Sequence, residues 1–358
     1  MEKNIVINRL PAKTWNWLKM NETKISMETA EKACDVIEKV PNAEGVRLEK
    51  QAPMQEIETG MGKEVAELLP EGETARKINT LFIPENSIQK EPIVLEYEYV
   101  QEGRYFDQLQ IQAEENSEVT VILLYRSKDG MKISVSNQTK VYAKENAKVH
   151  LYTIQLLSKN TECLCDFGGK CEKDAQIMNL QLQLGAGKLY TGASTELSGE
   201  RSNYQMDIGY LAEGTERVDM NYVVRHIGKK TESQITATGI LKDKAFKLFR
   251  GTLDFITGCS GAKGAESEDV LLLSEDVVNQ TIPLILCGEE DVEGSHGATI
   301  GKLDEQILFY LGSRGFERKE AEQLVAKAKM DALCSMVPSQ EMQEKIQSYL
   351  EERIHEGL

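Results

Sequence analysis

Residues 116–121 (NSEVTV), 146–151 (NAKVHL), 174–179 (DAQIMN) and 214–219 (GTERVD) are four copies of one short pattern, and this repeat decides the fold. Each copy begins with a polar turn and continues into a segment whose apolar residues fall at every second place. A period of two is typical of β-strands. Repetition after 30, 28 and 40 residues is typical of short strands stacked in a coil with loops of varying size.

The alternation extends well beyond the repeat, from about Ile93 over some two hundred residues, and residues 218–224 (VDMNYVV) show it clearly. A β-sandwich also contains many short strands separated by turns, so periodicity alone leaves both folds open. The absence of helical segments between the strands and the repeat are both compatible with a β-helix, and on these features alone a β-sandwich stays open.

Helical patterns are predicted at both ends of the chain. Residues 27–37 carry apolar side chains near helical spacing, and residues 62–69 form a second pattern that stops at Pro70. We therefore expect an N-terminal helical region over residues 1–85, a β-domain over 86–303 and a helical domain over 304–358.

Three C-terminal helices are predicted. Asp304 can cap the first, and Gly315 stands where a left-handed residue ends a helix. The second, over about 319–336, should bury one apolar face, which comprises Ala321, Leu324, Val325, Ala328, Ala332 and Met336. The third follows Ser339 and carries Met342, Ile346, Tyr349 and Leu350. Such short helices must pack on the β-domain, on each other or on a partner.

Composition excludes several classes of protein. The 358 residues have a mean hydropathy of -0.40 and no apolar run long enough for a membrane span, and the N-terminus lacks the features of a signal peptide. Seven cysteines without a disulfide-like spacing indicate reduced thiols, so we expect a cytoplasmic protein. A net charge of -16 argues against binding to nucleic acid.

No catalytic motif is present. The serine-hydrolase elbow, the zinc-protease motif and the P-loop are all absent, so the chain is not expected to be an enzyme of these classes or to bind a nucleotide through a P-loop. Cys163, Cys165 and Cys171 lie within nine residues beside two glycines. Three thiolates on such a loop can bind zinc or an iron-sulfur intermediate, while the alternative is an exposed loop of reduced thiols.

Several segments, in this order along the chain, resemble the SufB/SufD family of iron-sulfur cluster assembly proteins. These segments are 226–233 (HIGKKTES), 249–251 (FRG), 271–274 (LLLS), 295–299 (SHGAT), 301–306 (GKLDEQ) and 309–315 (FYLGSRG). The resemblance covers about residues 205–328 and implies a mainly β fold, a right-handed parallel β-helix flanked by N- and C-terminal helical segments.

The resemblance also implies a functional site around His296. In the family, a histidine of this motif lies at the interface between SufB and SufD and takes part in cluster assembly, with an imidazole able to ligate iron. SufB carries a glutamate where this chain has Gly297, and a cysteine where it has Glu268. Both differences indicate a SufD-like chain, which supplies His296, with Glu268 tentatively beside the assembly site.

The implied function is that of a non-enzymatic scaffold subunit of the SUF complex. It would pair with a SufB-type paralogue through the β-helix and share a transient iron-sulfur cluster with it. It would bind a SufC-type ABC ATPase through the C-terminal helices of residues 304–358, with Asp304, Leu308, Tyr310, Arg314 and Gly315 as candidate contact residues. Two alternatives remain, a homodimeric scaffold acting with the ATPase alone and a β-helical carbohydrate-active enzyme.

Overall fold

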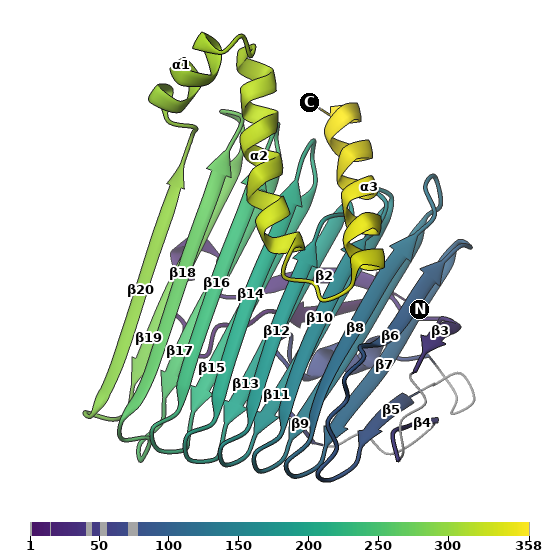
Figure 1. Cartoon of the computed structure of the whole chain (residues 1–358), viewed down its shortest axis with the longest axis vertical. Helices are drawn as coiled ribbons and strands as arrows, with labels where there is room; N and C mark the ends of the chain where they lie inside the picture. Colours follow the sequence, from purple (N-terminus) through teal and green to yellow (C-terminus); the bar gives the residue numbers. More distant parts are fainter. Residues whose placement is uncertain (1, 15, 41–44, 51–55, 71–77, 358) are drawn as a thin grey trace.

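The computed structural model describes residues 2–14, 16–40, 45–50, 56–70 and 78–357, and most of these form a stack of parallel coils (Figure 1). Two nine-stranded sheets face each other, and successive strands of the chain alternate between them. Strand pairing within both sheets is parallel except where β3 and β4 join at one end. With 53% strand and about eight turns, the chain confirms the prediction of a mainly β, parallel solenoid.

The even sheet contains the even-numbered strands β6 to β20 and β3. In spatial order its strands are β20 (Val292–Gly301), β18 (Ala262–Leu272), β16 (Glu232–Leu241), β14 (Asn203–Ala212), β12 (Gln176–Gln183), β10 (Lys148–Leu156), β8 (Glu118–Ser127), β6 (Ile93–Tyr99) and β3 (Val36–Lys39).

The odd sheet contains the odd-numbered strands β5 to β19 and β4. Its strands are β19 (Val278–Cys287), β17 (Phe246–Phe255), β15 (Arg217–His226), β13 (Lys188–Leu197), β11 (Thr161–Cys171), β9 (Ile133–Ala143), β7 (Gly103–Ala113), β5 (Ile78–Ile83) and β4 (Arg47–Lys50). Strands β3, β4 and β5 thus join the sheets before residue 86, although the predicted domain limits themselves stay predictions.

A residue with left-handed backbone recurs once per coil ahead of the even sheet. These residues are Asn86, Asn116, Asn146, Asp174, Arg201 and Lys230, with φ between 55° and 60°. Asparagine and aspartate tolerate this conformation better than most residues. The Asn146 and Asn116 amides also stack, each donating from Nδ2 to the Oδ1 of the preceding asparagine at 3.1 Å.

The turn positions correct one part of the predicted repeat. Residues 214–219 lead into β15 of the odd sheet, so they are not the fourth copy of the pattern in the even sheet. The fourth position is Arg201, which lies 27 residues after Asp174 and forms two hydrogen bonds with its carboxylate. An arginine at a turn gives no recognisable turn signal, and the apparent interval of 40 residues arose because Gly214 was matched instead.

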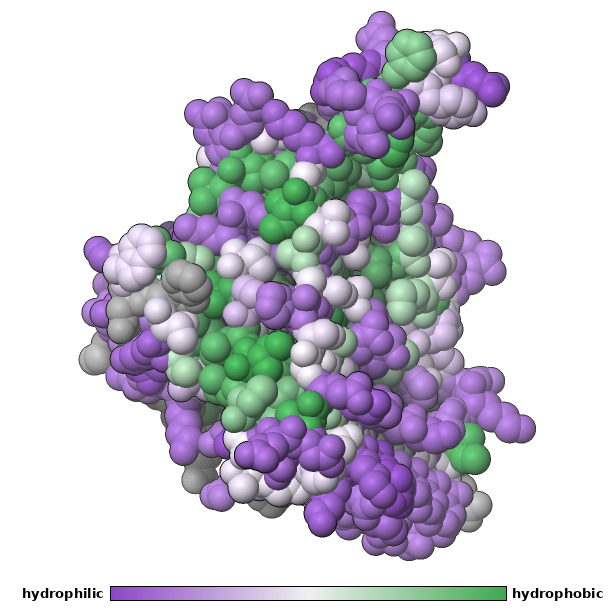
Figure 2. Space-filling view, turned by 90° about the vertical axis from the view of Figure 1, so that its left-hand side faces the viewer, coloured by the Kyte–Doolittle hydropathy of each residue, from purple (hydrophilic) through white to green (hydrophobic). Residues whose placement is uncertain are grey.

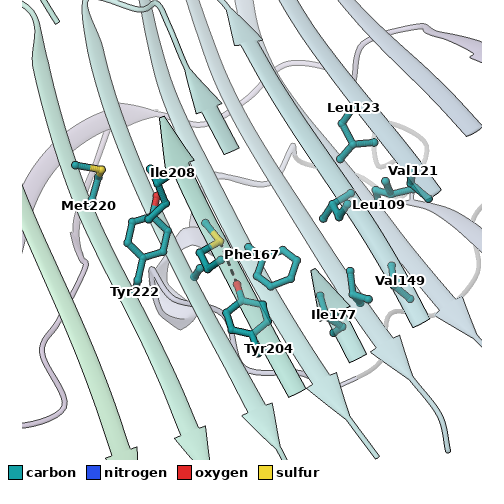
Figure 3. Close-up of a cluster of buried hydrophobic side chains, with 14 of the residues drawn as sticks. Leu109, Val121, Leu123, Val149, Phe167, Ile177, Tyr204, Ile208, Met220 and Tyr222 are labelled. Carbon is teal, nitrogen blue, oxygen red and sulfur yellow. Dashed lines mark hydrogen bonds between the residues drawn. The ribbon is translucent and has the colours of Figure 1, made fainter. Parts of the chain in front are cut away.

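Apolar side chains from both sheets meet between them and form the solenoid interior (Figure 3). The residues labelled there are Leu109, Val121, Leu123, Val149, Phe167, Ile177, Tyr204, Ile208, Met220 and Tyr222. They belong to strands that are remote in sequence but stacked in space. Some polar groups inside form hydrogen bonds with each other, and the Tyr204 hydroxyl donates to the Met206 sulfur at 3.3 Å.

The N-terminal segment is not the predicted run of helices. Strands β1 (Glu2–Ile7) and β2 (Thr23–Glu28) form an antiparallel hairpin, and among the residues described before β5 only the short 3-10 helices η1 (Asn16–Leu18) and η2 (Lys63–Leu68) are helical. The helix predicted over 27–37 is therefore wrong, whereas the pattern over 62–69 does form η2.

The backbone of residues 27–37 finds its hydrogen-bond partners on the solenoid. The Glu31 amide donates to the Arg104 carbonyl at 2.9 Å, and the Phe106 amide donates to the Lys32 carbonyl at 3.0 Å. Apolar side chains of the hairpin and of η2 cover the outer face of the odd sheet, where they contact Phe106, Leu164 and Tyr190. Tertiary contacts thus override a weak helical pattern.

The C-terminal helices α1 (Glu305–Ser313), α2 (Arg318–Cys334) and α3 (Gln340–Gly357) follow the last strand, and α2 and α3 lie along the outer face of the even sheet (Figure 1). Met342, Ile346 and Leu350 are buried against it, as predicted. Among the described residues, none of the helices combines the length and the apolar character that crossing a bilayer requires.

The buried face of helix α2 agrees only in part with the predicted one. Ala321 is buried and Val325 packs partly buried against the sheet cluster, both as expected, but the other buried residues are Ala326, Met330 and Cys334, which were not predicted. Leu324 and Met336, expected in the core, are exposed. The helix carries two overlapping apolar stripes, and periodicity cannot say which of them meets the sheet.

Candidate site at the open end of the solenoid

The last coil leaves one end of the solenoid uncovered. β20 pairs only with β18, and β19 pairs only with β17, so each has an outer edge with no strand beside it in the described chain. Figure 2 faces this end and shows hydrophobic residues gathered in patches among polar ones. The interior rows of side chains, closed elsewhere by the next coil, reach the surface here.

His296 lies in this open row. It is part of β20, and it is exposed. Val292, four residues earlier on the same strand, packs against the interior cluster, so the alternation turns His296 toward the interior side as well. Its register partner on β18 is Glu266. The imidazole therefore faces the mouth of the solenoid.

Glu268 lies one layer deeper in a closed network. Its Oε1 accepts hydrogen bonds from Lys247 Nζ at 2.5 Å and from the Tyr210 hydroxyl at 3.0 Å, and its Oε2 accepts one from Thr281 Oγ1 at 2.7 Å. Burial lowers the pKa of Lys247, an effect that the Glu268 carboxylate opposes. Both oxygens of Glu268 accept hydrogen bonds from side chains inside the solenoid, so its carboxylate is not open to a ligand.

Glu266, two residues before Glu268, points the same way but has different surroundings. It is only 5% exposed, and it forms no hydrogen bond or ion pair with any residue that the structure describes. Burial, and then the nearby Glu268 carboxylate, raise the pKa of Glu266 to about 7. A side chain at Gly251 would crowd this carboxylate, because a Cβ there would lie 3.2 Å from its Cδ.

Glu266, Lys247 and Thr281 were not among the residues that the sequence singled out. One signal for Glu266 was available, since residues 262, 264, 266, 268 and 270 alternate as Ala, Gly, Glu, Glu and Val in the predicted interior positions. Two carboxylates in an interior row are unusual because a buried charge needs a partner.

The three clustered cysteines do not lie on a loop. Cys163, Cys165 and Cys171 belong to β11, and at odd positions they all face the solenoid interior, where they are buried. Burial raises the pKa of all three thiols, to about 12 for Cys165, so they stay protonated and are poor metal ligands. In the described parts of the chain, no group of three His, Cys, Asp or Glu residues is placed to hold a metal ion.

The predicted partner-binding residues gather at α1. The Asp304 carboxylate caps the helix by accepting from the Gln306 amide at 2.8 Å, and Gly315 has a left-handed backbone with φ of 95°, both as predicted. Leu308 is buried, whereas Arg314 is exposed and its guanidinium lies 5.3 Å from the centre of the Tyr310 ring. Tyr310 is 56% exposed and Phe309 is 79% exposed.

A surface groove of about 730 Å³ crosses the ends of β14, β16, β18 and β20. Its carboxylates are Glu232 and Glu293, and Glu293 pairs with Lys263 at 2.9 Å. Tyr204 is the only aromatic residue in its lining, and that side chain is buried. The groove therefore does not favour the carbohydrate-active alternative, which needs exposed aromatic rings beside free carboxylates.

Comparison with known proteins agrees with the geometry. Residues 98–329, well over half of the chain, match the family described as the SufBD core domain of the SUF system for FeS cluster assembly. The chain belongs to this SufBD family. The match begins about a hundred residues before the segments that carry the resemblance in sequence and spans the solenoid from β6 to most of α2.

Three relatives of the SufBD family illustrate the likeness. The chain is 27% identical over 279 residues to the iron-sulfur cluster assembly protein SufD of Bacillus subtilis, covering 76% of this chain and 63% of that protein. It is 28% identical over 227 residues to an iron-sulfur cluster assembly SufBD family protein of Pyrococcus horikoshii, covering 63% of this chain and 50% of that protein. It is 25% identical over 185 residues to SufD of Escherichia coli, covering 52% and 44%.

The chain thus spans about half the length of the curated relatives it matches, and up to 63% of one of them. Two of the relatives carry the name SufD, which confirms the SufD-like character inferred from Gly297 and Glu268. Membership of the SufBD family links the chain to iron-sulfur cluster assembly.

Proposed function

We propose that this chain is a non-enzymatic scaffold subunit for iron-sulfur cluster assembly and that the open end of the solenoid is its working surface. The observation that carries this proposal is an exposed histidine on the uncovered last strand of a SufBD-family solenoid. The cluster is cargo that passes through this site. The proposal places the protein in the cytoplasm, and it assigns nucleotide binding to a partner.

The open end is proposed to bind a SufB-type paralogue. Edge strands expose unpaired backbone amides and carbonyls, which natural proteins normally protect. β19 and β20 have such edges, and the exposed apolar residues Val278 and Ile300 lie on them. A paralogue that continued both sheets would satisfy the backbone and cover these side chains. It would also complete the site around His296.

Helices α1 and α2 are proposed to bind a SufC-type ABC ATPase. Ile307, Phe309 and Tyr310 on α1 are exposed, and so is Leu324 on the outward stripe of α2. Exposed apolar side chains gathered in this way are typical of protein-binding surfaces. The stripe of α2 that periodicity assigned to the core is thus available to a partner.

The two contacts can be tested by co-expressing the chain with the SufB-type and SufC-type proteins of the same genome. The tagged chain is purified, and the bound chains are identified by mass. We expect both partners to co-purify with the wild type. Phe309→Glu should release the ATPase and keep the paralogue, because α1 lies outside the open edges. Recovery of a second copy of this chain in place of the paralogue would establish the homodimeric alternative.

Point substitutions suit this test better than removal of residues 304–358. Helices α2 and α3 cover Ile122, Leu124 and Leu182 on the even sheet, so their removal would expose a large apolar face. A matched control is Lys319→Glu, which changes the charge of an exposed residue near the start of α2. ATPase binding that survives Phe309→Glu unchanged would refute the assignment of α1.

A further inference from the structure

Glu266 is a buried carboxylate without a protein partner, and it lies in the strand next to His296. It is 5% exposed, and it forms no hydrogen bond or ion pair with the residues that the structure describes. Glu268 on the same strand differs, since three donors occupy its two oxygens. The Glu266 oxygens are not among the fully enclosed polar atoms without a partner, so they keep contact with the mouth of the solenoid. Glu266 is therefore available to a ligand that enters there.

The strand register sets the spacing between Glu266 and His296. They are direct partners in the parallel pairing of β18 with β20, so their side chains leave the same face of neighbouring strands. Such strands lie about 4.8 Å apart. A metal ion bound to one imidazole nitrogen and one carboxylate oxygen needs about 2.1 Å to each, so a single ion fits between the two side chains.

The side of His296 that faces away from β18 is open, because His296 is exposed and no strand in the described chain follows β20. The absence of a side chain at Gly251 lets Glu266 pack against the opposite wall, where a Cβ would lie 3.2 Å from the Glu266 Cδ. Imidazole nitrogen and carboxylate oxygen together are a ligand combination that suits iron.

We propose that Glu266 and His296 form a half-site for ferrous iron at the mouth of the solenoid. This inference rests on the proposed role in cluster assembly and identifies the second residue of the same site. Two protein ligands leave the remaining coordination positions to water, sulfide or side chains of the paralogue. A half-site with two protein ligands binds iron weakly, and weak binding suits an ion that is passed on during cluster assembly.

The half-site can be tested without measuring cluster assembly. The purified full-length chain is dialysed against ferrous iron alone in the absence of oxygen, and the bound iron is quantified. The variants are His296→Ala, Glu266→Gln and Glu266→Asp. The matched control is Glu293→Gln, because Glu293 is an acidic residue of β20 at an outward position, paired with Lys263. Thermal melting verifies that each variant is folded.

We expect the wild type to bind one iron ion per chain, and both His296→Ala and Glu266→Gln to weaken binding at least tenfold. Glu266→Asp keeps the carboxylate on a shorter side chain, farther from His296, so it should give an intermediate affinity for iron. Glu293→Gln should bind iron like the wild type. Loss of iron in His296→Ala with wild-type affinity in both Glu266 variants would overturn the role of Glu266 and leave the proposed function standing. A wild type that binds no iron at millimolar concentration would overturn the half-site. A measurement of cluster maturation in cells would then test the proposed function separately.

Discussion

His226 and His296 both lie in the interior row of a strand, one inside the solenoid and one at its open end. His226 is buried, and its two ring nitrogens share hydrogen bonds with the Thr231 and Ser233 hydroxyls at 2.7 and 2.8 Å. Burial lowers the pKa of His226 to about 4, so it is neutral in the folded protein. His296 has no strand beyond it, and it is exposed.

The difference shows how position along a solenoid divides stability from function. A polar side chain in a middle coil is closed in by coils on both sides, and hydrogen bonds such as those of His226 then stabilise it. The same row at the last coil is open, so a side chain there can bind something from outside. Three predictions test this division, from the largest expected effect on folding to the smallest.

The largest effect is expected where a buried ion pair is broken one layer below the open end. Lys247→Met leaves the Glu268 carboxylate without its ammonium partner in the interior, and it should lower the free energy of unfolding by about 3–5 kcal/mol. Urea denaturation measures this change. The control is Lys263→Met, which breaks an exposed, solvent-screened pair with Glu293 and should change the free energy of unfolding far less. Similar losses in both variants would mean that the interior of the last coils is already open to water.

A smaller effect should follow the titration of His226. Its pKa is lower in the folded protein than in the unfolded chain, so its stabilising contribution is lost as pH falls from about 6.5 to about 4. His226→Gln removes this contribution and should reduce the acid-induced loss of unfolding free energy by on the order of 2–3 kcal/mol relative to the wild type. The measurement is the stability of both proteins at several pH values. Parallel pH profiles would show that His226 is already solvated in the native state.

The smallest effect on folding is expected at His296. His296→Ala removes an exposed side chain that touches no closed network, so the free energy of unfolding should change by about 0.5 kcal/mol or less. Cluster maturation in cells should nevertheless fall sharply, because alanine offers iron no lone pair. His296→Cys is the matched variant and should restore part of the function as a softer ligand. Cells whose only copy of this subunit is the His296→Ala variant provide the test. If they mature clusters normally, His296 is a solvated surface residue without a role in assembly.

Local signals in the sequence determined much of this protein. Alternation with a period of two predicted the strands, and the repeat at Asn116 and Asn146 predicted a regular spacing between them, because both are properties of short segments. The resemblance to the SufB/SufD family then implied that these strands form a parallel β-helix. The Asp304 cap and the buried face of α3 were predicted for the same reason. The motif around His296 also pointed to the right family.

Only the tertiary structure decided how these segments use their side chains. The sequence placed residues 27–37 in a helix, yet their backbone pairs with the solenoid, and it placed three cysteines on a loop that proved to be the interior face of β11. It also drew attention to Glu268, whereas the register with β20 brings Glu266 beside His296. Register, burial and the end of a sheet depend on residues about thirty positions away in the chain, so no local pattern can reveal them.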